Sequence, residues 1–114
     1  MKERTKLFAV RIVTLFVSLP KWEEAQVIGR QLLRSGTSVG AHYREASRVQ
    51  SSAEFISKIS VGLQELDESA YWMELLIEAN IVSQTLLADL MQESNELMAI
   101  LNASLRIARQ NKDR

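Results

Sequence analysis

Four arginines in the second quarter of the sequence have a spacing that suits phosphate recognition. If residues 21–48 form one helix, these side chains fall within about a quarter of its circumference and span about 27 Å. A guanidinium presents forked donors to phosphate oxygens, and a row of them can follow a nucleic-acid backbone. The pattern is also typical of a solvated face, or of a face paired with acids of a neighbouring helix. The candidate nucleic-acid-binding residues are Arg30, Arg34, Arg44 and Arg48.

An acidic segment follows the arginine row along the chain. Residues 1–50 hold nine basic and four acidic residues, whereas residues 51–82 hold one basic and six acidic residues. This asymmetry fits a nucleic-acid patch, and it equally fits the two halves of a contact between subunits. Within the acidic segment, Trp72 shares one side of the expected helix with several glutamates. An apolar anchor rimmed by charge is typical of an interface, although a tryptophan lying on its own bundle gives the same pattern. The candidate oligomer-interface residues are Val61, Trp72, Leu76, Glu54, Glu65 and Glu68.

The residue types of the chain give little support for catalysis or metal binding. The single histidine, His42, precedes Glu45 in the reverse of the Glu-x-x-His order that carboxylate-bridged di-metal bundles use. No segment resembles a nucleophile elbow, and the chain has no cysteine. We therefore expect a protein that is not an enzyme and that has no metal site and no cofactor.

Length and composition limit the chain to one domain, residues 1–114. The chain is 46% hydrophobic and 25% charged, and its 14 basic residues balance its 14 acidic residues, so nucleic-acid binding requires a local patch. The absence of cysteine fits a reducing cytoplasm. The apolar run 7–19 contains Arg11 and is shorter than the roughly 20 residues that span a bilayer. We expect a cytoplasmic protein with no membrane partner.

The apolar periodicity predicts an all-α, up-down-up-down four-helix bundle. The expected helices cover residues 3–18, 21–48, 52–79 and 84–110. Pro20 separates the first two, Ser51 and Glu54 have capping-box spacing, and Asn80 suits the end of the third helix. Gly36 and Gly40 lie inside the second helix. There they would allow a close helix contact, whereas a loop or a phosphate cradle is the alternative.

The first helix carries more apolar surface than one small bundle can cover. Its polar positions form a narrow stripe, and apolar residues cover most of the remaining circumference. A bundle of this size has little depth in which to bury a second apolar face. The pattern therefore predicts self-association.

Several short motifs over residues 6–80 together resemble the four-helix-bundle proteins encoded in 23S ribosomal RNA intervening sequences. The motifs are Phe8-Ala9, Ile12-Val13, Leu19-Pro20-Lys21, Ile28-Gly29-Arg30-Gln31-Leu32-Leu33-Arg34-Ser35, Ser38-Val39-Gly40-Ala41, Glu45-Ala46, Ser52-Ala53-Glu54-Phe55, Lys58-Ile59, Glu65, Glu68 and Tyr71-Trp72. That family is similar to the accessory variability protein of diversity-generating retroelements. The sequence departs from the retroelement branch in being formally neutral, and it has His42 where the family often has asparagine.

The resemblance implies a homopentameric barrel of four-helix bundles. In the retroelement branch it further implies a basic surface that binds nucleic acid and the reverse transcriptase. The leading hypothesis is a non-enzymatic scaffold that engages structured RNA or DNA through the arginine row, beside a reverse transcriptase or an RNA-processing protein. The alternative is a purely structural module whose arginine row pairs with Glu54, Glu65 and Glu68 of an adjacent subunit.

Overall fold

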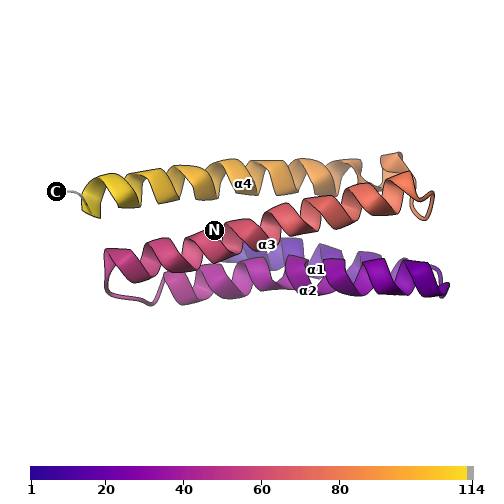
Figure 1. Ribbon diagram of the computed structural model, residues 1–114, viewed down its shortest axis with the longest axis horizontal. Coiled ribbons are helices and arrows are strands. Elements are labelled where there is room, and N and C mark those ends of the chain that lie inside the picture. The colour runs from indigo at the N-terminus through magenta and orange to yellow at the C-terminus, as the bar shows by residue number, and fades with distance from the viewer. Residues whose placement is uncertain (113–114) are drawn as a thin grey trace.

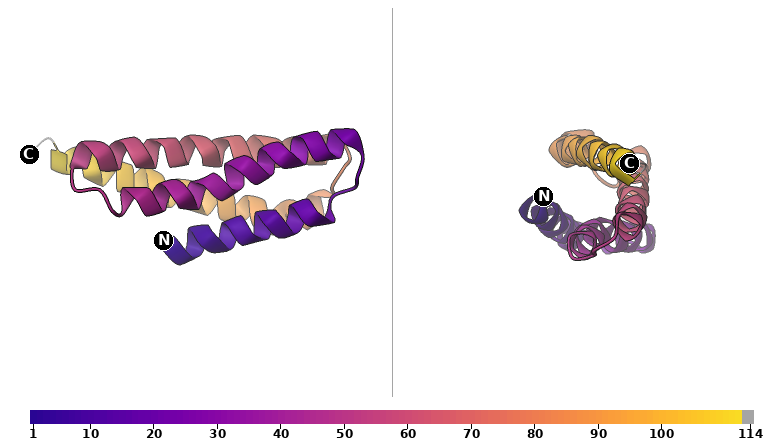
Figure 2. Two further views of the ribbon diagram at one scale, coloured as in Figure 1. Left: turned by 90° about the horizontal axis from the view of Figure 1, so that it is seen from below. Right: turned by 90° about the vertical axis from the view of Figure 1, so that its left-hand side faces the viewer.

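Four long helices make up most of the chain. The computed structural model describes residues 1–112, and the helices are α1 (Lys2–Ser18), α2 (Glu23–Ala46), α3 (Ser52–Glu78) and α4 (Gln84–Lys112). They run up and down along a body of 52 × 20 × 20 Å (Figure 1). Each helix packs beside the next, and α1 and α4 adjoin less closely, as the end-on view in Figure 2 shows. The expected all-α fold with four helices is confirmed, and the described residues contain no strand.

The predicted helix boundaries in the second half of the chain have clear local causes. The Ser51 hydroxyl accepts a hydrogen bond from the Glu54 N–H at 3.1 Å, which caps α3. Asn80 has a φ of 59°, and the Ile81 N–H donates to the Leu76 carbonyl at 3.0 Å, so α3 ends in a Schellman motif. The Ser83 hydroxyl accepts from the Leu86 N–H at 3.2 Å at the start of α4.

The second helix is shorter than the predicted range 21–48. Leu19 and Trp22 have extended backbones with ψ angles of 149° and 145°, so α2 begins only at Glu23. A residue that precedes proline is pushed out of the helical region, which explains Leu19 and places Pro20 in the connection. At the other end, Arg48 lies in a turn after α2 and does not continue the helical row.

The glycines of α2 allow α1 to approach closely. The helix is continuous through Gly36 and Gly40, as the apolar register predicts. A Cβ atom added at Gly36 would lie 2.8 Å from Ile12 Cγ1, and one added at Gly40 would lie 3.3 Å from Thr5 Oγ1. These glycines therefore act in helix packing within a continuous helix, and neither belongs to a glycine-rich loop.

A polar residue, Ser69, occupies a core position in the second half of α3. Ser69 and Leu76 are fully buried, whereas Ala70 and Ile77, which the apolar pattern favours, are only partly buried. The Ser69 hydroxyl lies 2.9 Å from the Ser35 hydroxyl of α2. A small polar residue thus occupies a core position, so a stripe drawn through apolar residues alone moves to the neighbouring positions.

A candidate anion-binding surface between the first two helices

The structure separates the four predicted arginines into three environments. Arg34 is ion-paired with acids of α3, and Arg30 is exposed on α2. Arg44 and Arg48 border a pocket between α1 and α2. The structure therefore does not bring the four guanidinium groups together as one continuous row.

Arg34 bridges two glutamates of its own chain. Its Nη1 lies 3.0 Å from Glu65 Oε2, and its Nη2 lies 2.6 Å from Glu68 Oε1. The Trp72 indole N–H also donates to Glu68 at 3.2 Å. The hydrogen bond from Arg34, helped by that from Trp72, holds the pKa of Glu68 below its ordinary value. Arg34 is therefore largely neutralised within the chain, as is typical of helix-to-helix pairing.

Four basic side chains line the pocket between α1 and α2. Lys2 and Lys6 lie one turn apart on α1, while Arg44 and Arg48 come from the last turn of α2 and the turn after it. The pocket has a volume of about 350 Å³, and Glu3 is the acidic residue in its lining. We call Lys2, Lys6, Arg44 and Arg48 the cationic pocket.

Helix packing places the two halves of the cationic pocket beside each other. Thr5 is 1% exposed and packs against Gly40, so the backbones approach closely at the base of the pocket. The Thr5 hydroxyl donates to the Met1 carbonyl at 2.9 Å, and the Thr37 hydroxyl donates to the Leu33 carbonyl at 2.7 Å. Since these hydroxyl protons are already used, the lysines and arginines supply the side-chain donors of the pocket.

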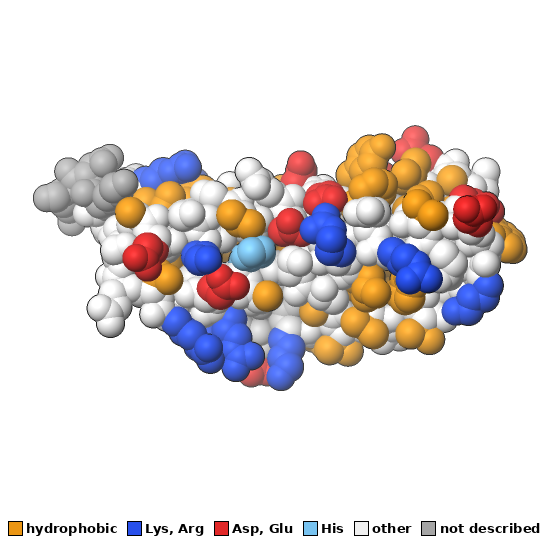
Figure 3. Space-filling view, turned by 60° about the horizontal axis from the view of Figure 1, so that its bottom comes forward, with side chains coloured by type: hydrophobic (Ala, Val, Ile, Leu, Met, Phe, Trp, Pro, Cys, Tyr) orange, Lys and Arg blue, Asp and Glu red, His pale blue; other side chains and the backbone are white. Residues whose placement is uncertain are grey.

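The cations of the pocket keep their charges available. Among the described residues, none of the four lies within ion-pair distance of a carboxylate. Glu45, which follows Arg44, is held by Lys58 of α3 at 2.7 Å. Figure 3 shows Lys and Arg side chains gathered at the lower left of one face. This concentration is a local positive patch on a chain with no net charge.

Lys2 and Lys6 were not among the residues predicted for this surface. Their spacing places both on one side of the first helix, which is visible in the sequence. Which side packs beside α2 depends on the contacts of Thr5 and Ile12 with the α2 glycines. That information is tertiary, so the sequence could not pair these lysines with Arg44 and Arg48.

The predicted interface residues on α3 lie in different environments. Leu76 is 0% exposed and belongs to the core of its own chain, so its assignment to an outward face is wrong. Val61 and Trp72 are half-buried, and Trp72 packs against the core. Glu54 is exposed at the start of α3. Glu65 and Glu68 face Arg34 of the same chain, so the expectation that they pair with a neighbouring subunit is wrong for that arginine.

A large apolar surface lies on the outward side of α1. Leu7, Val10, Val13 and Val17 are 59%, 53%, 43% and 68% exposed. They lie opposite Phe8, Ile12 and Leu15, which are buried in the core. We call the four exposed residues the α1 apolar face. The excess apolar character predicted for this helix is thus present on the surface.

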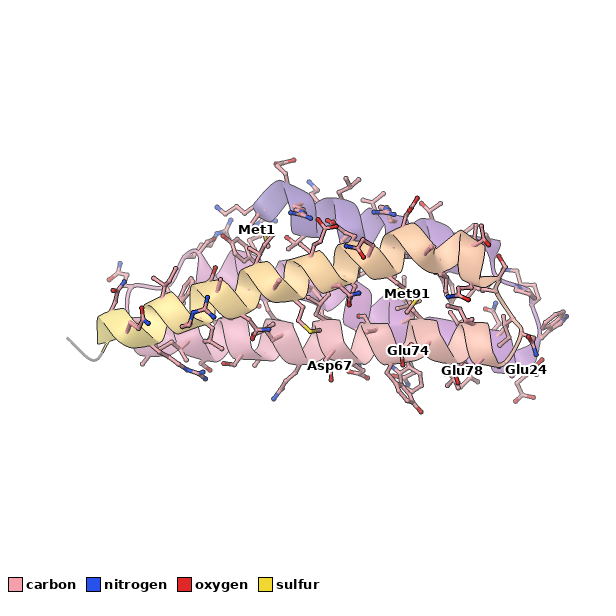
Figure 4. The ribbon with its side chains drawn as sticks, turned by 90° about the horizontal axis from the view of Figure 1, so that it is seen from above. Met1, Glu24, Asp67, Glu74, Glu78 and Met91 are labelled. Carbon is pink, nitrogen blue, oxygen red and sulfur yellow. The ribbon has the colours of Figure 1, made fainter. Side chains whose placement is uncertain are left out.

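A row of acids remains exposed on α3. Asp67, Glu74 and Glu78 are exposed and flank Tyr71, whose side chain is 55% exposed. Figure 4 shows the three acids along one side of α3, pointing away from the bundle. Unlike Glu65 and Glu68, they make no ion pair with another described residue. They are the acidic surface of α3 that is open to solvent or to a partner.

In the described part of the chain, His42 and the acidic residues do not form a metal-binding group. His42 is half-buried, and its Nδ1 has no hydrogen-bond partner. Residues 1–112 contain no group of three His, Cys, Asp or Glu side chains arranged to hold a metal ion. Within the same residues, no helix combines the length and apolar character needed to cross a membrane.

Comparison with known proteins agrees with the fold and the motifs. The sequence profile of the 23S rRNA-intervening sequence protein family matches residues 1–103. The chain belongs to this family. It is also similar to a solved structure from Bacteroides thetaiotaomicron VPI-5482, described as a protein of unknown function from the S23 ribosomal protein family. The two are 38% identical with a TM-score of 0.86, over 91% of this chain and 96% of the other. No curated protein matches the chain.

Proposed function

We propose that this member of the 23S rRNA-intervening sequence family is a non-enzymatic scaffold that binds structured RNA or DNA. The observation that carries the proposal is the convergence of Lys2, Lys6, Arg44 and Arg48 on one pocket, with no acidic partner among the described residues. Lysine and arginine contacts to phosphates supply most of the sequence-independent affinity for nucleic acid. A chain without net charge needs such a local patch, and the cationic pocket is one.

The scaffold acts as a cytoplasmic assembly of several copies. The exposed α1 apolar face supports self-association, because contiguous exposed apolar surface is typical of protein interfaces. The occupant we propose is a second copy of the chain. The assembly is a homopentamer, as the family resemblance implies. It would present several cationic pockets to one nucleic acid and to a reverse transcriptase or an RNA-processing protein.

Charge-neutralising variants test the nucleic-acid proposal. Fluorescence anisotropy with labelled structured RNA and duplex DNA should show binding to the wild type that weakens as salt rises. Arg44→Gln and Lys6→Gln should each weaken this binding. Arg30→Gln is the matched control, because Arg30 is exposed on the same helix as Arg44 but lies outside the pocket. Equal binding by all four proteins would contradict the proposal, as would no binding at low salt.

A purely structural module is the second candidate function. The pairing of Arg34 with Glu65 and Glu68 favours it, since part of the basic surface already serves packing within the chain. In this case Arg44 and Lys6 contact acids of a neighbouring subunit. Their neutralisation would then lower the oligomer mass in light scattering, and no nucleic acid would bind to the intact wild type.

A further inference from the structure

The unpaired arginines of the predicted row do not form a continuous track along α2. Arg34, in the middle of the α2 row, is neutralised by Glu65 and Glu68. Arg30 lies 14 residues before Arg44, which corresponds to about 21 Å along the helix. A nucleic-acid backbone that followed α2 would therefore cross a neutral stretch. The cationic pocket brings four basic side chains without ion pairs together at one place.

We propose that the cationic pocket binds a terminal phosphate monoester of an RNA strand in preference to internal phosphodiesters. This inference rests on the proposed function and adds the chemical class of the group bound. A monoester carries a charge of about −1.5 to −2 at pH 7 and has three terminal oxygens, whereas an internal phosphodiester carries one charge. Four cations around one pocket of about 350 Å³ match the more highly charged group better.

The geometry of the pocket lining supports recognition by charge. Lys2 and Lys6 approach from α1, and Arg44 and Arg48 approach from the α2 side, so a bound phosphate meets donors from two directions. Arginine supplies forked donors, and lysine supplies compact point charges. Since Thr5 and Thr37 use their protons on backbone carbonyls, the lining threonines add no donor for reading a base.

Glu3 allows the preference of the pocket for a doubly charged phosphate to be tested. Its carboxylate lines the same pocket and opposes the four cations. A negative charge at this position repels a dianion more strongly than a monoanion. Replacement by glutamine should therefore strengthen the binding of a monoester more than the binding of a phosphodiester.

The test compares single-stranded RNAs of identical sequence, labelled at the 3′ end, that carry either a 5′-monophosphate or a 5′-hydroxyl. Anisotropy titrations should give about tenfold tighter binding of the 5′-monophosphate RNA by the wild type, the size expected for charge-assisted hydrogen bonds. Lys6→Gln and Arg44→Gln should remove this difference, Arg30→Gln should preserve it, and Glu3→Gln should enlarge it. Circular dichroism of each variant checks that the fold is intact.

Competition separates the RNA end from free phosphate. Inorganic phosphate and pyrophosphate should displace the 5′-monophosphate RNA only at high concentration if the strand adds contacts, and at low concentration if the pocket selects the free ion. The second result would overturn the assignment to an RNA end. Equal affinity for both RNAs would overturn the monoester inference and leave the proposed nucleic-acid function standing. If neither RNA binds at low salt, the proposed function fails as well.

Discussion

The Arg34 guanidinium lies 2.6 Å from the Glu68 carboxylate, so the third helix of the same chain holds an arginine from the middle of the predicted row. This pairing assigns Arg34 to packing between α2 and α3. It leaves Arg44 and Arg48 to combine with lysines from α1 in a separate surface. Arginines that look equivalent in the sequence therefore have different roles.

Neutralising Arg34 should affect stability more than nucleic-acid binding. The Arg34→Gln variant loses its ion pairs with Glu65 and Glu68, and a double-mutant cycle with Glu68→Gln should give a coupling of about 0.2–1 kcal/mol. RNA affinity should change less than it does in Arg44→Gln. Urea denaturation and anisotropy on the same samples measure both effects. An equal loss of RNA affinity in the two variants would show that Arg34 contacts nucleic acid.

Two glycine substitutions should shift stability in opposite directions. A Cβ atom at Gly36 would lie 2.8 Å from Ile12 Cγ1, so the overpacking cost of about 1–3 kcal/mol should exceed the helix-propensity gain of Gly36→Ala. At Gly62 the nearest atom, His42 Cβ, would lie 3.7 Å away. Gly62→Ala should therefore raise the free energy of unfolding by about 0.5–1 kcal/mol. Chemical denaturation measures both, and greater stability of Gly36→Ala would contradict the close α1–α2 contact.

A charge on the α1 apolar face should disrupt assembly. Val10 is 53% exposed at the centre of this face, and Val10→Glu places a carboxylate where we propose a second copy packs. Light scattering should show the wild type at a mass near five times 12.9 kDa and the variant at a lower mass. Ile107→Glu on α4 is the matched control, because Ile107 is 55% exposed and lies away from this face. An unchanged mass for Val10→Glu would refute the interface.

Acid should weaken the joint between α1 and α4. The Arg4 guanidinium lies 2.8 Å from Glu93, and its hydrogen bond holds the pKa of Glu93 below the ordinary value. A carboxyl group with a lowered pKa in the folded state stabilises the protein above its unfolded pKa of about 4.3. This stability is lost as pH falls through the folded pKa. Thermal melts from pH 7 to pH 3 should show a smaller loss of Tm in Glu93→Gln. An identical pH dependence would show that the pair contributes nothing to folding.

The sequence predicted the helices well because their signals are local. Ser51, Asn80 and Ser83 act at helix ends through hydrogen bonds to residues within one or two turns, and the apolar period identified the continuous helix through Gly36. The structure departs from the predictions where contacts between residues far apart in the sequence determine which side of a helix is buried. The buried Ser69 hydroxyl of α3 donates to the Ser35 hydroxyl of α2. Leu76, two turns after Ser69, lies on the same buried side of α3.

The candidate site was only half predictable for the same reason. Arg44 and Arg48 were identified from their spacing, although Arg48 lies beyond the end of α2. Lys2 and Lys6 join them because α1 packs on the glycines of α2, a relationship that no periodicity within one helix contains. The removal of Arg34 from the row likewise depends on Glu65 and Glu68, which lie about thirty residues further along the chain.

The salt dependence of RNA binding shows whether the cationic pocket contacts phosphates. The slope of log Kd against log salt should be steep for the wild type and should fall by roughly two in the double variant Lys6→Gln/Arg44→Gln, because each cation that contacts a phosphate contributes about one to the slope. The Arg30→Gln slope should match that of the wild type. An unchanged slope in the double variant would show that the cationic pocket makes no phosphate contact.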